Sequence, residues 1–262
     1  MSYIINISGG GFFSLYHLTL EEFLHKNYTN ELPINEILQF KIVINNSHNF
    51  NNKKMFDDIF VYDNSKTFEP LELHSDKRWF HNINKNPELL PLVKTIINKN
   101  TITDKINTTI NNYCSIFDIT ENTLGVHIRL TDMNAAHPDH GIFTIQTYID
   151  KINKLINTHR NINNIYIASD NIESINHLKK YYKNIIKISY IEDNVRSLYE
   201  NDNFNYVINA MNNDNTTSSL YHVNIMIEML VLSKCSYFIH RVSDFANFAI
   251  IYSDTFKVIE CL

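Results

Sequence analysis

The chain has 262 residues and a formal net charge of -5; 44% of its residues are hydrophobic and 19% are charged. Such a composition suits one large globular domain or two of roughly 100–150 residues each. The mild acidity argues against nucleic acid as the main partner, because a basic surface is needed to neutralise phosphates. No run approaches the roughly 18 consecutive apolar residues of a membrane helix, and the N-terminus lacks the basic start of a signal peptide. We therefore expect a cytoplasmic protein that does not span a membrane.

Neither cysteine nor histidine spacing indicates a metal site or a disulfide framework. Cys114, Cys235 and Cys261 stand far apart without a CxxC pattern, and no HExxH occurs among the 12 histidines. Reduced, mostly buried thiols in a reducing compartment are the simpler interpretation, and zinc is not expected.

The first part of the chain opens with a strand, a glycine turn and a helix. Residues 3–8 form a short apolar run, three glycines follow at 9–11, and 12–26 have the leucine spacing of a helix. This order is typical of the start of a βα unit. Further along, the pattern predicts strands over 40–45 and 58–63, a loop over 64–85, and helices over 87–100 and 103–117, with Pro87 and Thr103 as first-turn or cap residues.

From residue 121 onwards, strands and helices alternate regularly. We predict strands over 123–129, 164–169, 184–189, 236–240 and 256–260, and helices over 143–157, 171–183, 219–235 and 243–253. Alternation of this kind requires a mostly parallel sheet covered by helices on both faces. The sequence therefore predicts the α/β class, with two Rossmann-like domains, 1–118 and 119–262, facing a cleft.

Residue types suited to ligand binding follow the ends of several predicted strands. In an open α/β sheet, ligands bind outside the carboxyl ends of the strands. Glycines let the backbone approach a ligand, and helix N-termini favour phosphate, so the set favours an anionic, hydroxyl-bearing ligand such as a nucleotide sugar. Its members are Gly10 and Gly11 after the first strand, Arg129 and Asp132 after "GVHI", Asp170 after "IYIAS", and Arg241 and Ser243 after "YFI".

Each of these residues has a simpler interpretation when taken alone. The glycine triplet is equally explained as a plain turn, and Arg129 as a charge at a solvated strand end. Asp170 and Ser243 are equally suited to cap the helices that follow them. The combination is more specific than any single member.

Three stretches together resemble the fucosyltransferase superfamily: "GVHIRLTD" (125–132), "IYIASDN" (165–171) and "EMLVLSKCSYFIHRVSDFANFAIIY" (228–252). The likeness is greatest to the α1,6- and protein O-fucosyltransferase branch and more distant to α1,2-fucosyltransferases. It covers about the last 140 residues well, and the earlier part only in outline through the glycine-rich turn. The family's central motif, His-x-Arg-(Arg)-x-Asp, stands here as His127, Arg129, Thr131 and Asp132. Leu130 occupies the place where the family often has a second arginine.

The resemblance implies an inverting, metal-independent glycosyltransferase of the GT-B type. Its donor would be GDP-fucose, its acceptor a hydroxyl of a glycan or a protein, and no cofactor would be needed. The chain also has no DxD pair to hold a metal between phosphates. Without a metal, protein groups must meet the charge that develops on the departing GDP, and Arg129 is the candidate for that role, since a guanidinium can bond two phosphate oxygens.

The remaining donor contacts also follow from the resemblance. Glu228 opens "EMLVLSKC" where the family usually has an aspartate that faces guanine, and a carboxylate can accept both the N1–H and the N2 amino group of that base. The other implied contacts are His127 to the base or ribose, Phe245 on the nucleoside, and Arg241 as a second positive charge. Ser243 and Asp244 stand where the family's serine contacts phosphate.

The general base is sought in the loop "NAAHPDHG". An inverting transfer needs a group that takes the proton of the acceptor hydroxyl. In α1,6-type relatives a glutamate follows the arginine motif, and the equivalent place falls at His137. Asp139 in the same loop is the other candidate, and ordinary loop polarity is the competing explanation for both.

Other functions remain open at this point. A transferase using another GDP-sugar, such as GDP-mannose, fits the same residues. A binding module that keeps the nucleotide cleft but has lost turnover is favoured by Leu130 and by the missing glutamate. An NAD-dependent enzyme is disfavoured, because the chain has no GxGxxG with an acid about 20 residues further on.

Overall fold

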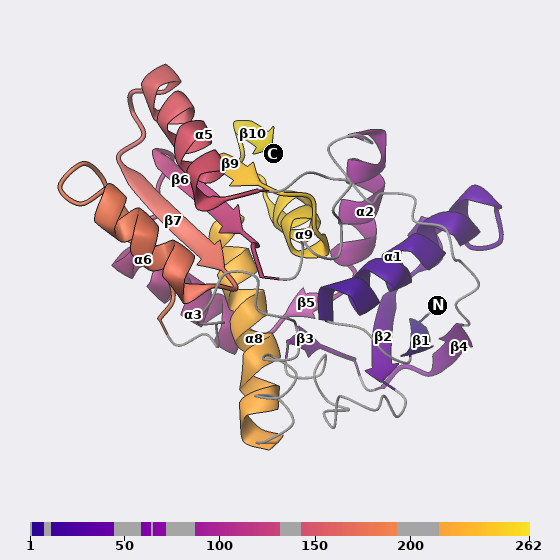
Figure 1. The fold of residues 1–262 in the computed structure, drawn as a ribbon. Coiled ribbons are helices and arrows are strands. Elements are labelled where there is room, and N and C mark those ends of the chain that lie inside the picture. The colour runs from indigo at the N-terminus through magenta and orange to yellow at the C-terminus, as the bar shows by residue number, and fades with distance from the viewer. Residues whose placement is uncertain are drawn as a thin grey trace.

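The computed structural model describes residues 2–7, 12–44, 59–63, 65–71, 87–131, 143–192 and 215–262. Two parallel sheets lie side by side with helices around and between them (Figure 1). The first sheet has the order β2 (Gln39–Ile44), β1 (Ser2–Ile7) and β4 (Phe68–Leu71). The second has the order β10 (Val258–Cys261), β9 (Tyr237–His240), β6 (Thr123–Ile128), β7 (Asn164–Ser169) and β8 (Lys187–Ser189).

The helices alternate with these strands along the chain. They are α1 (Phe12–Tyr28), α2 (Leu90–Ile97), α3 (Asp104–Ile116), α5 (Ile145–Thr158), α6 (Ile172–Tyr181), α8 (Asn215–Leu232) and α9 (Asp244–Tyr252), with short 3-10 turns η1 (Ile34–Glu36) and η3 (Pro87–Leu89). The predicted α/β class is confirmed, and every predicted helix is found. None of the described helices is long and apolar enough to cross a membrane.

Two strands correct the sequence prediction for the first half. β4 lies inside the stretch predicted as a loop, and among the described strands it pairs with β1 alone. Its proline, Pro70, is tolerated because an edge strand does not need every backbone donor. A two-residue strand β5 (Thr101–Ile102) also pairs antiparallel with β3 (Phe60–Val61), which is shorter than the predicted 58–63.

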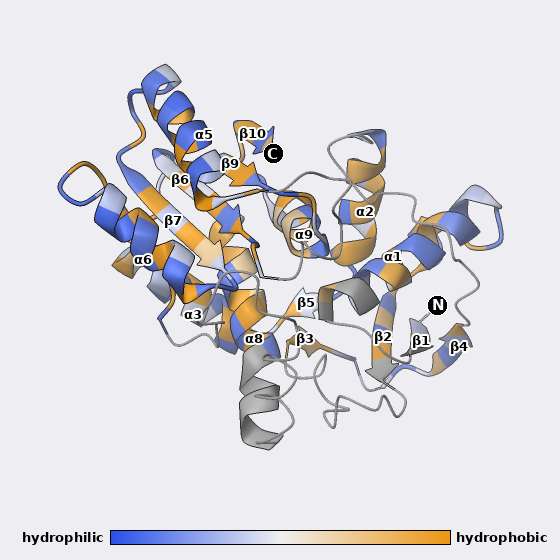
Figure 2. Cartoon of the chain, viewed as in Figure 1, coloured by the Kyte–Doolittle hydropathy of each residue, from blue (hydrophilic) through white to orange (hydrophobic). Residues whose placement is uncertain are grey.

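The three central strands of the second sheet, β9, β6 and β7, are buried on both faces, as their continuous apolar runs predict. Leu124, Val126 and Ile128 of β6 point to the face covered by α5 and α6. The alternate positions of the neighbouring strands point to the face covered by α3, α8 and α9, as Tyr166 and Phe238 do. In Figure 2, β7 is largely hydrophobic, and the neighbouring helices α5 and α6 present mainly hydrophilic residues on their outer surfaces.

Gly125 of β6 permits a close approach by α8. A Cβ atom at this position would lie 2.6 Å from Leu232 Cδ1 and 3.3 Å from Cys235 Sγ. A side chain here would force Leu232 to move and would crowd Cys235, so glycine lets the end of α8 lie directly on β6.

One hydrophobic cluster runs continuously from the first sheet to the second. Tyr16 of α1 stacks on Phe248 of α9, with ring centroids 5.0 Å apart and planes 6° apart. Lys94 of α2 donates to the carbonyl of Ser253, at the end of α9, at 2.6 Å. The helix α9 therefore belongs by sequence to the second half but packs on α1 and α2 of the first. The division into domains 1–118 and 119–262 stays a prediction.

Candidate functional site

The carboxyl ends of β6 and β7 bring the central motif together. The two strands pair in parallel with Ile128 opposite Ser169, so the residues that follow them are neighbours. Asp170 accepts a hydrogen bond from Thr131 Oγ1 at 2.5 Å, and its Oδ2 lies 3.9 Å from Arg129 Nε. The Arg129 side chain is 29% exposed, so the guanidinium is anchored at one side and still reaches solvent.

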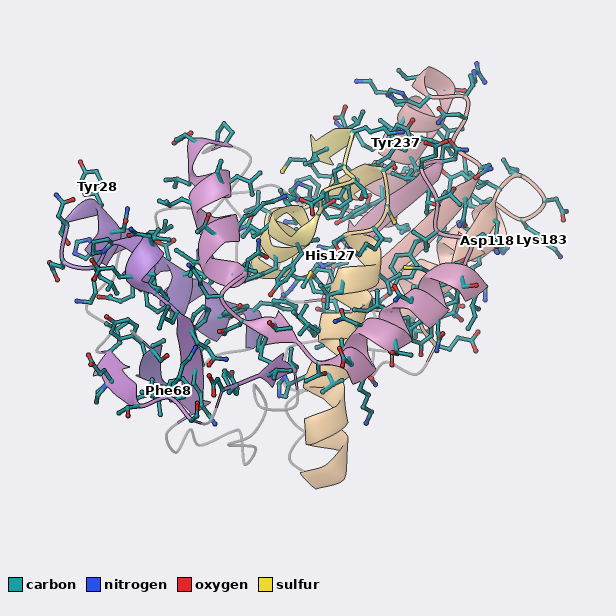
Figure 3. All side chains as sticks on the ribbon, turned by 180° about the vertical axis from the view of Figure 1, so that it is seen from behind. Tyr28, Phe68, Asp118, His127, Lys183 and Tyr237 are labelled. Carbon is teal, nitrogen blue, oxygen red and sulfur yellow. The ribbon has the colours of Figure 1, made fainter. Side chains whose placement is uncertain are left out.

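His127 and the start of α9 form the next layer of the site. The imidazole stacks on Phe245, with ring centroids 4.4 Å apart and planes 17° apart. Burial, then the positive charge of Arg129 and the nearby His240, hold the pKa of His127 well below its usual value. The ring is therefore neutral, and its buried Nδ1 has no hydrogen-bond partner among the residues that the structure describes. Figure 3 places His127 near the middle of the molecule, with Tyr28 and Lys183 near its two ends.

Ser243 caps helix α9, which is one of the two roles predicted for it, the other being ligand binding. Its Oγ accepts a hydrogen bond from the amide of Ala246 at 3.1 Å. A serine hydroxyl that accepts one bond still has its own proton to donate. Capping therefore leaves this residue able to bind an anion at the helix N-terminus.

Asp170, by contrast, is not the cap of α6. The side chain of the next residue, Asn171, accepts the amide of Ser174 at 2.7 Å and fills that role. The capping interpretation of Asp170 is wrong, because its carboxylate turns to Thr131 and Arg129 instead.

Two further basic and acidic residues are buried in the same region. Arg241, only 2% exposed, follows β9 and lies with its guanidinium carbon 4.6 Å from the centre of the Phe143 ring. Glu228 is 5% exposed on α8, the helix that packs on β7 and α9. Arg241 thus follows a strand that pairs with β6, and Glu228 lies on the same side of the sheet as His127, the side covered by α8 and α9.

His17 is a site residue that the sequence did not suggest. It lies on α1, where its Nδ1 is 2.5 Å from Asp244 Oδ1 and its Nε2 is 3.0 Å from Glu21 Oε1. The histidine and glutamate four residues apart on one helix face were visible in the sequence. The contact with Asp244 was not visible, since it joins residues 227 positions apart.

The fold is similar to that of several solved fucosyltransferases. The chain is similar to NodZ alpha-1,6-fucosyltransferase soaked with GDP-fucose, with a TM-score of 0.56 and 10% identity over 99% of this chain and 95% of that one. A second similar structure is that of the fucosyltransferase NodZ from Bradyrhizobium. This chain is also similar to POFUT1 in complex with GDP-fucose, with a TM-score of 0.51 and 10% identity over 100% of this chain and 97% of that one.

The chain has the fold of a GT-B fucosyltransferase. A mutant of Arabidopsis thaliana FUT1 in complex with GDP adds a third likeness, with a TM-score of 0.51 and 10% identity over 99% of this chain and 69% of that one. No protein-family model and no curated protein sequence matches the chain. The fold expected from the resemblance is thus confirmed.

Several predicted residues of this fucosyltransferase-like site lie outside the described residues: Gly10, Gly11, Asp132, His137 and Asp139. The two general-base candidates therefore stay predictions, as do the ligand contacts of the described residues. Within the described ranges, no three histidine, cysteine, aspartate or glutamate side chains gather in a way that could hold a metal ion.

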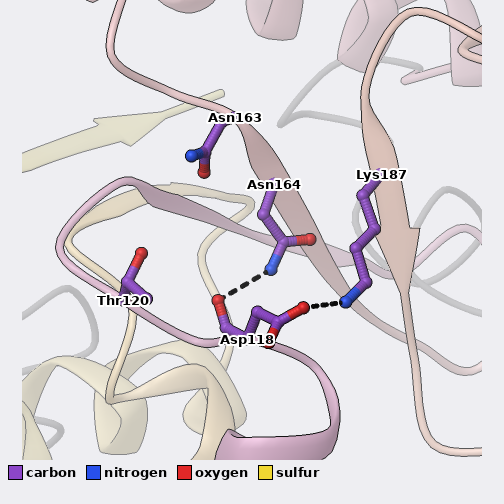
Figure 4. Close-up of a pocket in the computed structure, with 5 residues that line it drawn as sticks. All are labelled: Asp118, Thr120, Asn163, Asn164 and Lys187. Atoms are coloured by element: carbon purple, nitrogen blue, oxygen red, sulfur yellow. Dashed lines mark hydrogen bonds and ion pairs between the residues drawn. The ribbon is translucent and has the colours of Figure 1, made fainter.

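A separate cavity of about 320 Å³ lies at the opposite edge of the second sheet (Figure 4). It is lined by Asp118, Thr120, Asn163, Asn164 and Lys187. Asn164 starts β7 opposite Thr123, the first residue of β6, so this cavity is at the amino ends of the strands. An ion pair between Lys187 and Asp118 borders it. It is therefore distinct from the candidate site of the fucosyltransferase fold, which lies at the carboxyl ends.

Proposed function

We propose that this protein transfers fucose from GDP-fucose to a hydroxyl of a glycan or a protein, with inversion and without a metal. The observation that carries this proposal is the meeting of Arg129 and Thr131 with Asp170 at one sheet edge, in a fold shared with proteins that hold GDP-fucose. We expect the reaction to take place in the cytoplasm.

In this proposal the diphosphate binds between Arg129 and the N-terminus of α9. Arg129 is held by Asp170 but partly exposed, so it can pair with phosphate oxygens. The hydroxyl of Ser243 and the first amides of α9 supply further donors, and the dipole of the helix favours an anion there. Arg241 adds a second positive charge nearby. These groups would meet the charge that develops when the bond from the sugar to the diphosphate breaks.

We assign the binding of guanine to Glu228 and the packing of the nucleoside to the stacked rings of His127 and Phe245. A carboxylate accepts the two adjacent donors of guanine, which adenine lacks. His127 is neutral, so its Nδ1 can take part in a hydrogen bond to the base or ribose without adding charge.

The acceptor hydroxyl attacks the anomeric carbon from the face opposite to the diphosphate. The new C–O bond forms as the old one breaks, and its electron pair leaves with the β-phosphate of GDP. The proton of the acceptor passes to His137 or Asp139, which follow β6 in the sequence.

A nucleotide screen tests the donor assignment. GDP should raise the melting temperature, and UDP and ADP should not, because only a ligand that binds the folded state stabilises it. Release of GDP from GDP-fucose and GDP-mannose, with mixed glycan acceptors, then separates fucosyl transfer from use of another GDP-sugar. Equal effects of the three nucleotides would overturn the assignment to GDP.

One observation favours a second function, a nucleotide-sugar-binding module with impaired turnover. Leu130 is 1% exposed and packs with the apolar residues under α5 and α6. Its side chain faces the core, so this position supplies no second positive charge beside Arg129. Stabilisation by GDP without release of GDP from any donor would favour this module.

A further inference from the structure

A buried histidine joins the two halves of the chain beside the proposed diphosphate site. His17 is 3% exposed, and each of its two ring nitrogens faces a carboxylate oxygen. Glu21, from its own helix, is fully buried, and Asp244, from α9, has a side chain that is 19% exposed. The three residues form a row that runs from the interior of α1 to the first turn of α9.

A protonated imidazole satisfies both contacts of this row. Two carboxylates can both accept a bond only if both ring nitrogens carry hydrogen. Burial is the largest single influence and lowers the pKa of His17, but the bonds and charges of Asp244 and Glu21 outweigh it and raise the pKa above the usual 6.5. On α2, which also packs on α1, Lys94 binds Ser253 and Asp254 instead.

The position of Asp244 makes its charge important. It is the first residue of α9, directly after the capping Ser243, so it stands where the proposed site places the diphosphate. A carboxylate beside a diphosphate repels it, and juxtaposed like charges are costly where solvent is scarce. The positive His17 offsets that charge and holds Asp244 toward α1.

We propose that His17 is a positioning residue, which neutralises Asp244 and turns it toward α1 so that the N-terminus of α9 can accept the diphosphate of the donor. This inference rests on the proposed function. It extends that function by making donor affinity depend on the protonation of a residue in the other half of the chain.

The test measures the dissociation constant of GDP-fucose by calorimetry from pH 6 to pH 9. Both phosphates of this ligand are esterified, so they do not titrate in the range. His127 and His240, whose pKa values are lowered, stay neutral there as well. We expect the affinity of the wild type to fall about tenfold as pH rises, which corresponds to a shift of one pKa unit in His17 on binding.

Three variants separate charge from structure. His17→Gln should bind about tenfold more weakly than the wild type at low pH, because a pKa shift of one unit on binding corresponds to a tenfold change in affinity. Its affinity should not depend on pH. Asp244→Asn should bind tightly at every pH, and the double variant should recover that affinity because no carboxylate is left to neutralise. His177→Gln, at an exposed position of α6, is the matched control and should behave as the wild type.

The outcomes distinguish this inference from the proposed function. A wild type that binds no GDP-sugar at any pH overturns both. A wild type that binds equally well across the range overturns the inference alone, as does a double variant as weak as His17→Gln, which would indicate a merely structural role. Should His17→Gln fail to fold, the wild type and Asp244→Asn still decide the matter by their pH profiles.

Discussion

The imidazole of His127 lies flat on the phenyl ring of Phe245, with 4.4 Å between the ring centroids. This contact joins the strand that carries the central motif to the first turn of α9. Phe245 also meets Phe13 of α1 edge to face at 5.3 Å. A single side chain thus links β6, α9 and α1 at the point where the candidate site begins.

Replacing Phe245 by leucine should weaken this junction. Phe245→Leu keeps an apolar side chain but loses both ring contacts, so we expect the free energy of unfolding to fall by about 1–2 kcal/mol. Urea denaturation measures the change. Tyr28→Leu, at a side chain that is 73% exposed, is the control and should change it by less than about 0.5 kcal/mol. Equal losses in the two variants would contradict the role given to the stack.

Arg129 should matter for turnover more than for folding. Arg129→Ala should lower kcat for GDP release by about 100- to 1,000-fold, the usual effect of removing one donor to a developing anion. Arg129→Lys should recover only part of this, because an ammonium cannot make the paired bonds of a guanidinium. Arg160→Ala, at an exposed arginine after α5, should leave kcat unchanged. Full activity of Arg129→Ala would remove this residue from the mechanism.

The assignment of Glu228 predicts a specific base preference. Wild type should bind GDP about tenfold or more tightly than IDP, whose base lacks the N2 amino group, since an unmet buried hydrogen bond costs about 1–3 kcal/mol. Glu228→Gln should bind both nucleotides with similar affinity, because the amide no longer presents two acceptors. Calorimetric titration of the two nucleotides gives both constants. An unchanged preference in Glu228→Gln would place the guanine elsewhere.

Packing at Gly125 predicts a steric penalty that a second change relieves. Gly125→Ala places a methyl group 2.6 Å from Leu232 Cδ1, so unfolding free energy should fall by about 1–3 kcal/mol. Leu232→Ala removes the clashing atom but leaves a cavity, so the double variant should lose clearly less than the sum of the two single losses. Strict additivity in urea denaturation would show that α8 does not lie on β6 in this way.

Buried neutral histidines predict a loss of stability in acid. Burial lowers the pKa of His222 and of His240 to about 4, although a backbone hydrogen bond raises the latter slightly. The unfolded chain then binds more protons than the folded one between about pH 6.5 and 4, so stability falls as pH falls through this window, by roughly 3 kcal/mol for each residue. His17 acts in the opposite sense: its stabilisation is complete below pH 6.5 and is lost as pH rises through its raised pKa.

Urea denaturation at several pH values checks these signs. His222→Gln cannot gain a proton, so its free energy of unfolding should fall less steeply from pH 6.5 to 4.5 than that of the wild type. A slope as steep as that of the wild type would argue against a buried, neutral His222.

The second half of the fold could be predicted from the sequence almost element by element. Its strands are apolar runs that end in polar turns, and 164–169 coincides with β7. The first half was harder: β4 contains Glu69 and Pro70 and has no strand pattern of its own, so only its pairing with β1 reveals it.

The candidate site was predictable where strand order alone decides it. The rule that ligands bind at carboxyl ends placed Arg129 and Asp170 together, and the structure brings them within 3.9 Å. The link from His17 to Asp244 was not predictable, because it depends on how α1 packs on α9 at nearly opposite ends of the chain. The sequence likewise left two roles open for Asp170, ligand binding or helix capping, and the structure gives the capping role to Asn171.

The stacking of Tyr16 on Phe248 limits how this protein can be recombined with others. Joining residues 1–118 of one chain to residues 119–262 of another would separate these two rings. Here such a graft would have to match the aromatic face of α1 to that of α9, because the cut at residue 118 divides one continuous core. A successful exchange would therefore carry α9 along with the incoming N-terminal half, or redesign Tyr16 and Phe248 as a pair.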